Sequence, residues 1–111
     1  MTQEAEPKRT RAIVAAVQRP SVSDLEFEAS LEELRQLAKT LGFEVVGRFT
    51  QKRAGFDSAA YFGTGKREEL RELVQNEVEP AHLVLIDHEI SPSQTFNLAK
   101  EVGCEVMDRT M

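Results

Sequence analysis

Residues 82–107, HLVLIDHEISPSQTFNLAKEVGCEVM, contain a complete strand–helix–strand unit and decide the fold class. The short apolar run His82–Ile86 is bounded by turn residues, which predicts a buried strand. Ser91–Gln94 has the pattern of a capping box with proline at the first helical position, so a helix is predicted to begin there. Gly103 ends that helix, and Cys104–Met107 predicts the next strand.

The same alternation extends toward the amino terminus. In chain order, the expected elements are a strand over 12–17, a helix from the Ser30/Glu33 capping box to Gly42, a strand over 43–50 and a helix over 65–77. The segments between them, 20–29 and 51–60, are polar and predict loops.

Each predicted helix has an apolar face that is expected to pack against the sheet. These faces consist of Phe27, Leu31, Leu34, Ala38 and Leu41 in the first helix, Leu70, Leu73 and Val74 in the second, and Phe96, Ala99 and Val102 in the third.

The alternation of strands and helices predicts an α/β fold with a four-stranded, mostly parallel sheet flanked by about three helices, in the order β-α-β-α-β-α-β. The 111 residues are 41% apolar, enough for one hydrophobic core. We therefore expect a single domain over 12–111. Residues 1–11 are polar and are expected to form a disordered lead-in.

Composition narrows the classes of function. The net charge of −5 argues against non-specific binding of DNA or another polyanion by the whole surface. No segment has the roughly 20 apolar residues of a membrane span, and no signal peptide precedes the domain. The single Cys104 is expected to be a buried, reduced thiol, which favours a cytoplasmic protein without membrane partners.

Ligands of parallel sheets bind beyond the carboxyl ends of the strands, so we expect a functional rim at that edge. Asp87, Glu89 and Asp108 carry oxygen ligands suited to a divalent cation, but their spacing matches no dedicated metal loop, and no metal site is predicted. Ser91 is better explained as a helix cap than as a nucleophile, and no catalytic residues are predicted. The rim residues expected to face another domain are Asp87, Glu89, Ser91, Gln94, Asp108 and Arg109.

A glycine-containing turn, Tyr61-Phe62-Gly63-Thr64-Gly65-Lys66, lies directly before the second predicted helix. Backbone N–H groups at such a helix start, together with Lys66, predict an anion site. The turn is not a phosphate-binding P-loop, because Ala60 occupies the first glycine position and Arg67 replaces the required Ser or Thr.

Two basic pairs, Lys52-Arg53 and Lys66-Arg67, bracket a loop that also contains Tyr61 and Phe62. Basic residues beside aromatic ones suit contacts with RNA phosphates and exposed bases. Alternatively, the two aromatic residues pack inward and anchor the loop. The sequence leaves both alternatives open.

Taken together, the motifs over roughly 12–110 resemble the amino-terminal domain of the HflX family of ribosome-associated GTPases. The residues that carry this resemblance are Ser30-Leu31-Glu32-Glu33-Leu34, Val45-Val46-Gly47, Thr50-Gln51-Lys52-Arg53, Tyr61–Lys66 with Glu69-Leu70, Asp87–Gln94 and Val106–Thr110.

The resemblance implies a cytoplasmic protein that binds the large ribosomal subunit through its rRNA, splits stalled ribosomes and hydrolyses GTP with Mg²⁺ in a later domain. This chain contains none of the GTPase motifs Gly-x-x-x-x-Gly-Lys-Ser/Thr, Asp-x-x-Gly and Asn-Lys-x-Asp. We therefore expect a non-catalytic docking and regulatory domain without its own cofactor, partnered by the GTPase domain of the same protein.

The residues predicted to contact the ribosome, RNA or a nucleotide are Gln51, Lys52, Arg53, Gly63, Thr64, Gly65, Lys66 and Arg67. An alternative hypothesis is a stand-alone nucleotide-binding α/β module that uses the Gly63–Lys66 helix start. The sequence does not distinguish a fragment of a longer protein from a free-standing relative of the domain.

Overall fold

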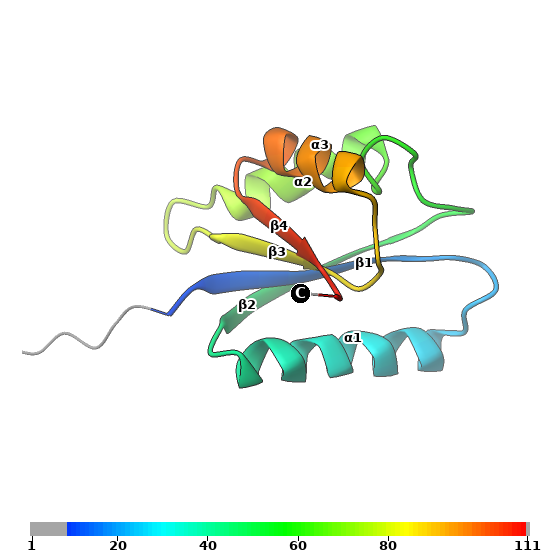
Figure 1. Ribbon diagram of the computed structural model, residues 1–111, viewed down its shortest axis with the longest axis horizontal. Coiled ribbons are helices and arrows are strands. Elements are labelled where there is room, and N and C mark those ends of the chain that lie inside the picture. Colours follow the sequence, from blue (N-terminus) through cyan, green and yellow to red (C-terminus); the bar gives the residue numbers. More distant parts are fainter. Residues whose placement is uncertain (1–8, 111) are drawn as a thin grey trace, which may run out of the picture.

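The computed structural model describes residues 9–110 and contains the predicted succession of strands and helices (Figure 1). In chain order the elements are β1 (Arg11–Gln18), α1 (Asp24–Thr40), β2 (Glu44–Lys52), α2 (Thr64–Val74), β3 (Leu83–Ile86), α3 (Pro92–Val102) and β4 (Glu105–Asp108). The expected lead-in lies mostly outside the described residues, and Arg11, assigned to it, is instead the first residue of β1.

The four strands form one sheet in the order β2-β1-β3-β4, and every neighbouring pair is parallel. The predicted α/β class is therefore confirmed. The chain moves from β1 to β2 in one direction and from β2 through β3 to β4 in the other. Right-handed crossovers then place α1 on one face of the sheet and α2 with α3 on the opposite face, as Figure 1 shows.

The central strand β1 is buried on both faces. Each residue of Ala12–Val17 is at most 1% exposed, as expected for a strand with helices on either side. Because successive side chains alternate, Ala12, Val14 and Ala16 pack with α1, whereas Ile13, Ala15 and Val17 pack with α2 and α3. The two hydrophobic cores thus share one strand.

Helix α1 begins seven residues earlier than predicted. Its N-cap is Ser23, whose side chain accepts a hydrogen bond from the backbone N–H of Glu26. Ser30 lies inside the helix and donates to Asp87 instead. Residues 24–29, predicted to be loop, are therefore helical. The chain carries the Ser-x-x-Glu pattern twice, and the earlier copy is the cap.

The other helix boundaries follow local signals more closely. The capping box of Ser91 and Gln94 is present at the start of α3, and Gly103 ends the helix in the left-handed conformation, with φ of 80°. Helix α2 ends at Val74, three residues before the predicted end at residue 77.

The predicted buried faces need three corrections. Leu41, Leu73 and Phe96 are 50%, 39% and 67% exposed, respectively. In α3 the buried positions are Leu98 and Val102, so the inward face is rotated away from Phe96. Local apolar spacing identified the helix but did not determine its rotation about its axis.

Candidate functional site at the carboxyl edge of the sheet

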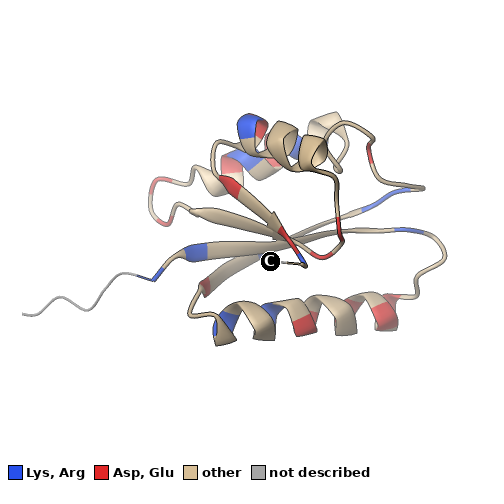
Figure 2. Cartoon of the chain, in the orientation of Figure 1, with Lys and Arg blue, Asp and Glu red and all other residues tan. Residues whose placement is uncertain are grey.

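The carboxyl ends of the four parallel strands lead to charged residues at one edge of the sheet, as predicted. Arg19 follows β1, Lys52 ends β2, Asp87 follows β3 and Arg109 follows β4. Figure 2 shows basic segments side by side where β1 and β2 end. Sequence reasoning therefore located the edge, and the side-chain contacts show which of its residues are accessible to a partner.

Asp87 is buried, and its side chain is only 2% exposed. Its carboxylate accepts a hydrogen bond from the Ser30 hydroxyl at 2.7 Å and one from the Arg109 guanidinium at 2.7 Å. Arg109 also donates to Ser30 Oγ at 2.8 Å and lies 3.7 Å from a carboxylate oxygen of Glu33. This network joins β3, α1 and the segment after β4. Asp87 and Arg109, predicted to face another domain, mainly hold this edge together.

A second rim carboxylate, that of Asp108, also accepts hydrogen bonds within the domain. It accepts hydrogen bonds from the backbone N–H groups of Ile90 at 3.1 Å and Thr110 at 3.0 Å, and one from the Thr110 hydroxyl. Burial raises the pKa of Asp108, but these hydrogen bonds outweigh it and lower the pKa overall. Glu89 is exposed. Among residues 9–110, no cluster of three or more His, Cys, Asp or Glu side chains is suited to a metal ion.

Ser91 and Gln94 cap the start of α3 reciprocally. The amide nitrogen of Gln94 additionally donates to the carbonyl oxygen of Asp57 at 2.9 Å. The interpretation of Ser91 as a cap is thus confirmed, and Gln94 ties α3 to the loop before α2.

The crevice between the ends of β1 and β3, where the strand order reverses, is the expected ligand position in such sheets. Here Tyr61 and His88 contribute side chains to this position. Tyr61 is fully buried; its hydroxyl accepts a hydrogen bond from the N–H of Val17 at 2.7 Å and lies 2.6 Å from His88 Nδ1. Because Phe62 is also fully buried, the alternative of inward-packed aromatic anchors is correct for both aromatic residues. Base stacking on Tyr61 and Phe62 is excluded in this conformation.

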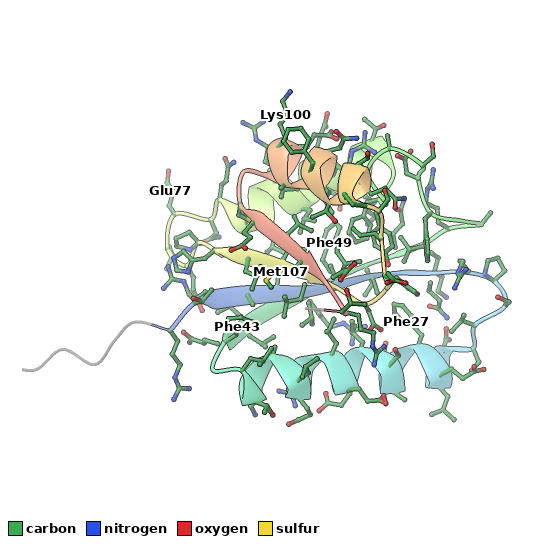
Figure 3. The ribbon with its side chains drawn as sticks, in the orientation of Figure 1. Phe27, Phe43, Phe49, Glu77, Lys100 and Met107 are labelled. Atoms are coloured by element: carbon green, nitrogen blue, oxygen red, sulfur yellow. The ribbon has the colours of Figure 1, made fainter. Side chains whose placement is uncertain are left out.

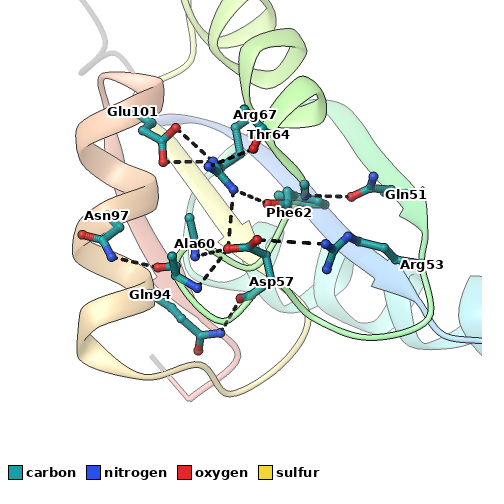
Figure 4. A network of polar contacts seen from close by, with 12 residues as sticks. Gln51, Arg53, Asp57, Ala60, Phe62, Thr64, Arg67, Gln94, Asn97 and Glu101 are labelled. Carbon is teal, nitrogen blue, oxygen red and sulfur yellow. Dashed lines mark hydrogen bonds and ion pairs between the residues drawn. The ribbon is translucent and has the colours of Figure 1, made fainter.

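The loop before α2 is held by an ion-paired network around Asp57 and Arg67 (Figure 4). Asp57 accepts hydrogen bonds from the N–H groups of Ala59 and Ala60, both at 2.9 Å. Hydrogen bonding from Ala60 is the main cause of the lowered pKa of Asp57.

Arg67 completes this network. Its guanidinium donates to the carbonyl oxygen of Phe62 at 2.6 Å and pairs with Glu101 at 2.9 Å and Asp57 at 3.5 Å. Only 12% of the Arg67 side chain is exposed. Arg67, predicted to contact a ligand, is a structural cation that joins the loop to α3.

The predicted anion site at the start of α2 is partly filled by the protein itself. The N–H of Gly63 donates to Gln51 Oε1 at 3.1 Å. The ammonium of Lys66 lies 3.4 Å from Glu69 and 5.6 Å from the centre of the Phe49 ring. Thr64 and Gly65 are exposed, and the first turn of α2 contains no acid. Nucleotide binding at this helix start remains a prediction, which rests on the exposed residues Thr64 and Gly65.

A highly accessible basic group of this edge lies at the end of β2. The Lys52 side chain is 79% exposed and has one long ion pair, 3.9 Å to Asp24. Arg53 is less available, because its guanidinium donates to the carbonyl oxygen of Gly55 at 2.8 Å. Lys52 and Arg53 border a hollow of about 430 Å³ together with Arg19.

Arg19 was not among the predicted contact residues. It is exposed, and its guanidinium carbon lies 4.6 Å from the centre of the Phe56 ring. Its position directly after the first strand was the signal that could have identified it.

Cys104 is half-buried, and burial raises the pKa of its thiol to about 11. The thiol is therefore protonated near neutral pH and is a poor nucleophile. In the described part of the chain, no helix combines the length and the apolar character that crossing a membrane requires.

Comparison with known proteins agrees with this architecture. A family model described as "GTP-binding GTPase N-terminal" matches residues 28–111. The chain belongs to this GTPase N-terminal domain family. The match starts inside α1 and covers all the segments that form the carboxyl edge except the end of β1.

Three relatives of this GTPase N-terminal domain are each named GTPase HflX. The protein from Caldanaerobacter subterraneus subsp. tengcongensis is 41% identical over 92% of this chain and 22% of its own length. That from Gluconacetobacter diazotrophicus is 35% identical over 96% of this chain and 31% of its length. That from Alkalihalophilus pseudofirmus is 48% identical over 78% of this chain and 20% of its length.

The resemblance to the HflX amino-terminal domain is therefore confirmed. The chain spans between about a fifth and a third of the length of these relatives.

Proposed function

We propose that this domain docks a GTP-binding protein onto the large ribosomal subunit and regulates the GTPase domain of the same polypeptide. In this proposal the domain has no catalytic role of its own. GTP and Mg²⁺ are bound by the GTPase domain, and the protein acts in the cytoplasm on stalled ribosomes. The membership in a GTPase N-terminal family supports the connection to GTP.

The observation that carries ribosome docking is the basic hollow bordered by Arg19, Lys52 and Arg53. The chain as a whole is acidic, with a net charge of −5, whereas the lining of this hollow contains three cations and one acid, Asp24, so it is a locally basic part of the surface. Cations at this edge suit contact with rRNA phosphates. The hollow lies at the carboxyl edge of the sheet, beside the ends of β1 and β2, and next to the crevice between β1 and β3 where parallel sheets usually bind their ligands.

Lys52→Glu is the sharpest test of this proposal. The Lys52 side chain is 79% exposed, whereas reversal of Arg53 would also remove its hydrogen bond to Gly55 and disturb the loop. In the full-length protein we expect Lys52→Glu to weaken co-sedimentation with purified large subunits by roughly tenfold, or about 1.4 kcal/mol. The loss should shrink as salt is raised, because the contact is electrostatic.

Lys100→Glu provides the matched control. Lys100 is an exposed cation in the last turn of α3 (Figure 3) and does not border the hollow. We expect it to change the affinity by less than about twofold. Equal effects of the two reversals, or no effect of either, would refute docking through the basic hollow.

A further inference from the structure

An apolar hollow of about 530 Å³ lies at the opposite edge of the sheet from β2. We call it the Phe96 surface, and it is lined by Ile90, Pro92, Thr95, Phe96, Met107 and Asp108. These residues come from the start of α3, the loop before it and the end of β4. Strand β4 pairs only with β3, so the surface borders an edge strand.

Phe96 is the feature that makes this surface unusual. It is 67% exposed, while Leu98 and Val102 of the same helix are fully buried. It is the only aromatic residue among the exposed large apolar side chains of residues 9–110. An exposed aromatic side chain beside an apolar hollow is typical of a surface that another polypeptide covers.

The position of the surface indicates which polypeptide covers it. Asp108, which ends β4, lines the hollow, so the point where the chain leaves the last strand borders this surface. In Figure 1 the end of the described chain then lies between the sheet and α1, so a following segment must pass around the β4 edge to reach the hollow. In the relatives the matched region is about a fifth to a third of the chain, and the family describes an amino-terminal domain. In those proteins several times the length of this domain must therefore follow it.

The segment that leaves β4 is also anchored to the domain, through contacts that include α1 on the other face of the sheet. Arg109 is bound to Asp87 and Ser30, and Thr110 donates to Asp108. A polypeptide that continues from an anchored residue needs little additional ordering to reach a neighbouring apolar surface, which favours an intramolecular contact.

We propose that the Phe96 surface is the docking site for the segment that directly follows this domain in the full-length protein, and that an apolar side chain of that segment fills the hollow. This inference rests on the proposed function in one respect, namely that the domain is the amino-terminal part of a longer GTP-binding protein. It does not depend on ribosome binding.

The test compares Phe96→Ser in the full-length protein and in the 111-residue chain by amide hydrogen exchange of β4 and α3. In the full-length protein we expect exchange at β4 to be at least about tenfold slower than in the 111-residue chain. Phe96→Ser should remove most of this protection. In the 111-residue chain the same substitution should leave the exchange rates nearly unchanged, because the side chain is already exposed.

Val78→Ser is the matched control, since Val78 is 91% exposed and lies far from this surface in the loop between α2 and β3. It should leave exchange at β4 unchanged in both proteins. Equal protection of β4 in the two wild-type proteins, or full protection in the Phe96→Ser protein, would overturn the inference. A native reading frame that ends at codon 111 would overturn it as well. Failure of the Lys52→Glu test alone would affect only the ribosome proposal.

Discussion

Tyr61 shows how one residue organises the carboxyl edge. Its backbone has a φ of 73°, the only positive value among the non-glycine residues that the structure describes. Such a conformation is costly for a bulky side chain and persists only when the surroundings stabilise it. The hydroxyl provides part of that stabilisation, because it accepts a hydrogen bond from the N–H of Val17 and shares a second hydrogen bond with His88 Nδ1.

Removal of the Tyr61 hydroxyl should destabilise the folded domain. We expect Tyr61→Phe to lower the free energy of unfolding by about 1–3 kcal/mol, because the buried N–H of Val17 loses its acceptor. Urea denaturation of the 111-residue chain measures this change. Phe96→Tyr, which adds a hydroxyl at an exposed position, serves as a control and should stay within about 0.5 kcal/mol. A Tyr61→Phe chain as stable as the wild type would show that the hydrogen bond to Val17 makes no net contribution to stability.

At the scale of elements, the sequence of α1 contains two possible capping boxes, and only one of them starts the helix. Ser23/Glu26 and Ser30/Glu33 both have the spacing of a capping box. The helix begins at the first copy because this adds two turns and buries Phe27, which is 6% exposed. Ser30 is then available to bind Asp87 across the sheet edge.

This assignment predicts the effect of a cap substitution. Ser23→Ala should reduce the free energy of unfolding by about 1 kcal/mol, because the first turn of α1 loses its side-chain acceptor. The measurement is urea denaturation, with Ser21→Ala as the control in the preceding turn. If the two substitutions have the same effect, Ser23 does not stabilise the start of α1.

At the scale of the whole molecule, several titrating groups make the folded state less stable at acidic pH than at neutral pH. Burial is the main cause of the lowered pKa of His88, and the nearby Asp87 opposes it only in part. Hydrogen bonds to Arg35 and Gln36 lower the pKa of Glu32 to about 2. The pKa values of Asp57 and Asp108 are lowered as well.

These shifts act in the same direction on stability. When the pKa of a group is lower in the folded state than in the unfolded state, the unfolded chain binds more protons at any pH between these two values. The free energy of unfolding therefore decreases as the pH falls through this range. We expect a first decrease below about pH 6.5 from His88 and a second below about pH 4.5 from the carboxyl groups. Urea titrations between pH 8 and pH 3 measure both. His88→Gln should abolish only the first decrease, and persistence of that decrease would assign it to another group.

Much of the architecture was predictable from sequence because its causes are local. The alternation of strands and helices, the Ser91–Gln94 cap and the Gly103 stop all depend on residues a few positions apart. The parallel sheet follows from helix-containing connections, and the parallel sheet in turn places the strand ends at one edge. Family membership was visible in the order of short motifs.

Tertiary structure alone decided which of the edge residues are accessible. Asp87 and Ser30 are 57 positions apart, and Arg67 and Glu101 are 34 apart, so no local pattern reveals that they bind each other. The rotation of α3 that exposes Phe96 likewise depends on how the helix packs against the sheet. The sequence by itself determined the elements and their order, because these arise from neighbouring residues. The packing of distant segments determined which charges are neutralised inside the domain and which surfaces remain for a partner.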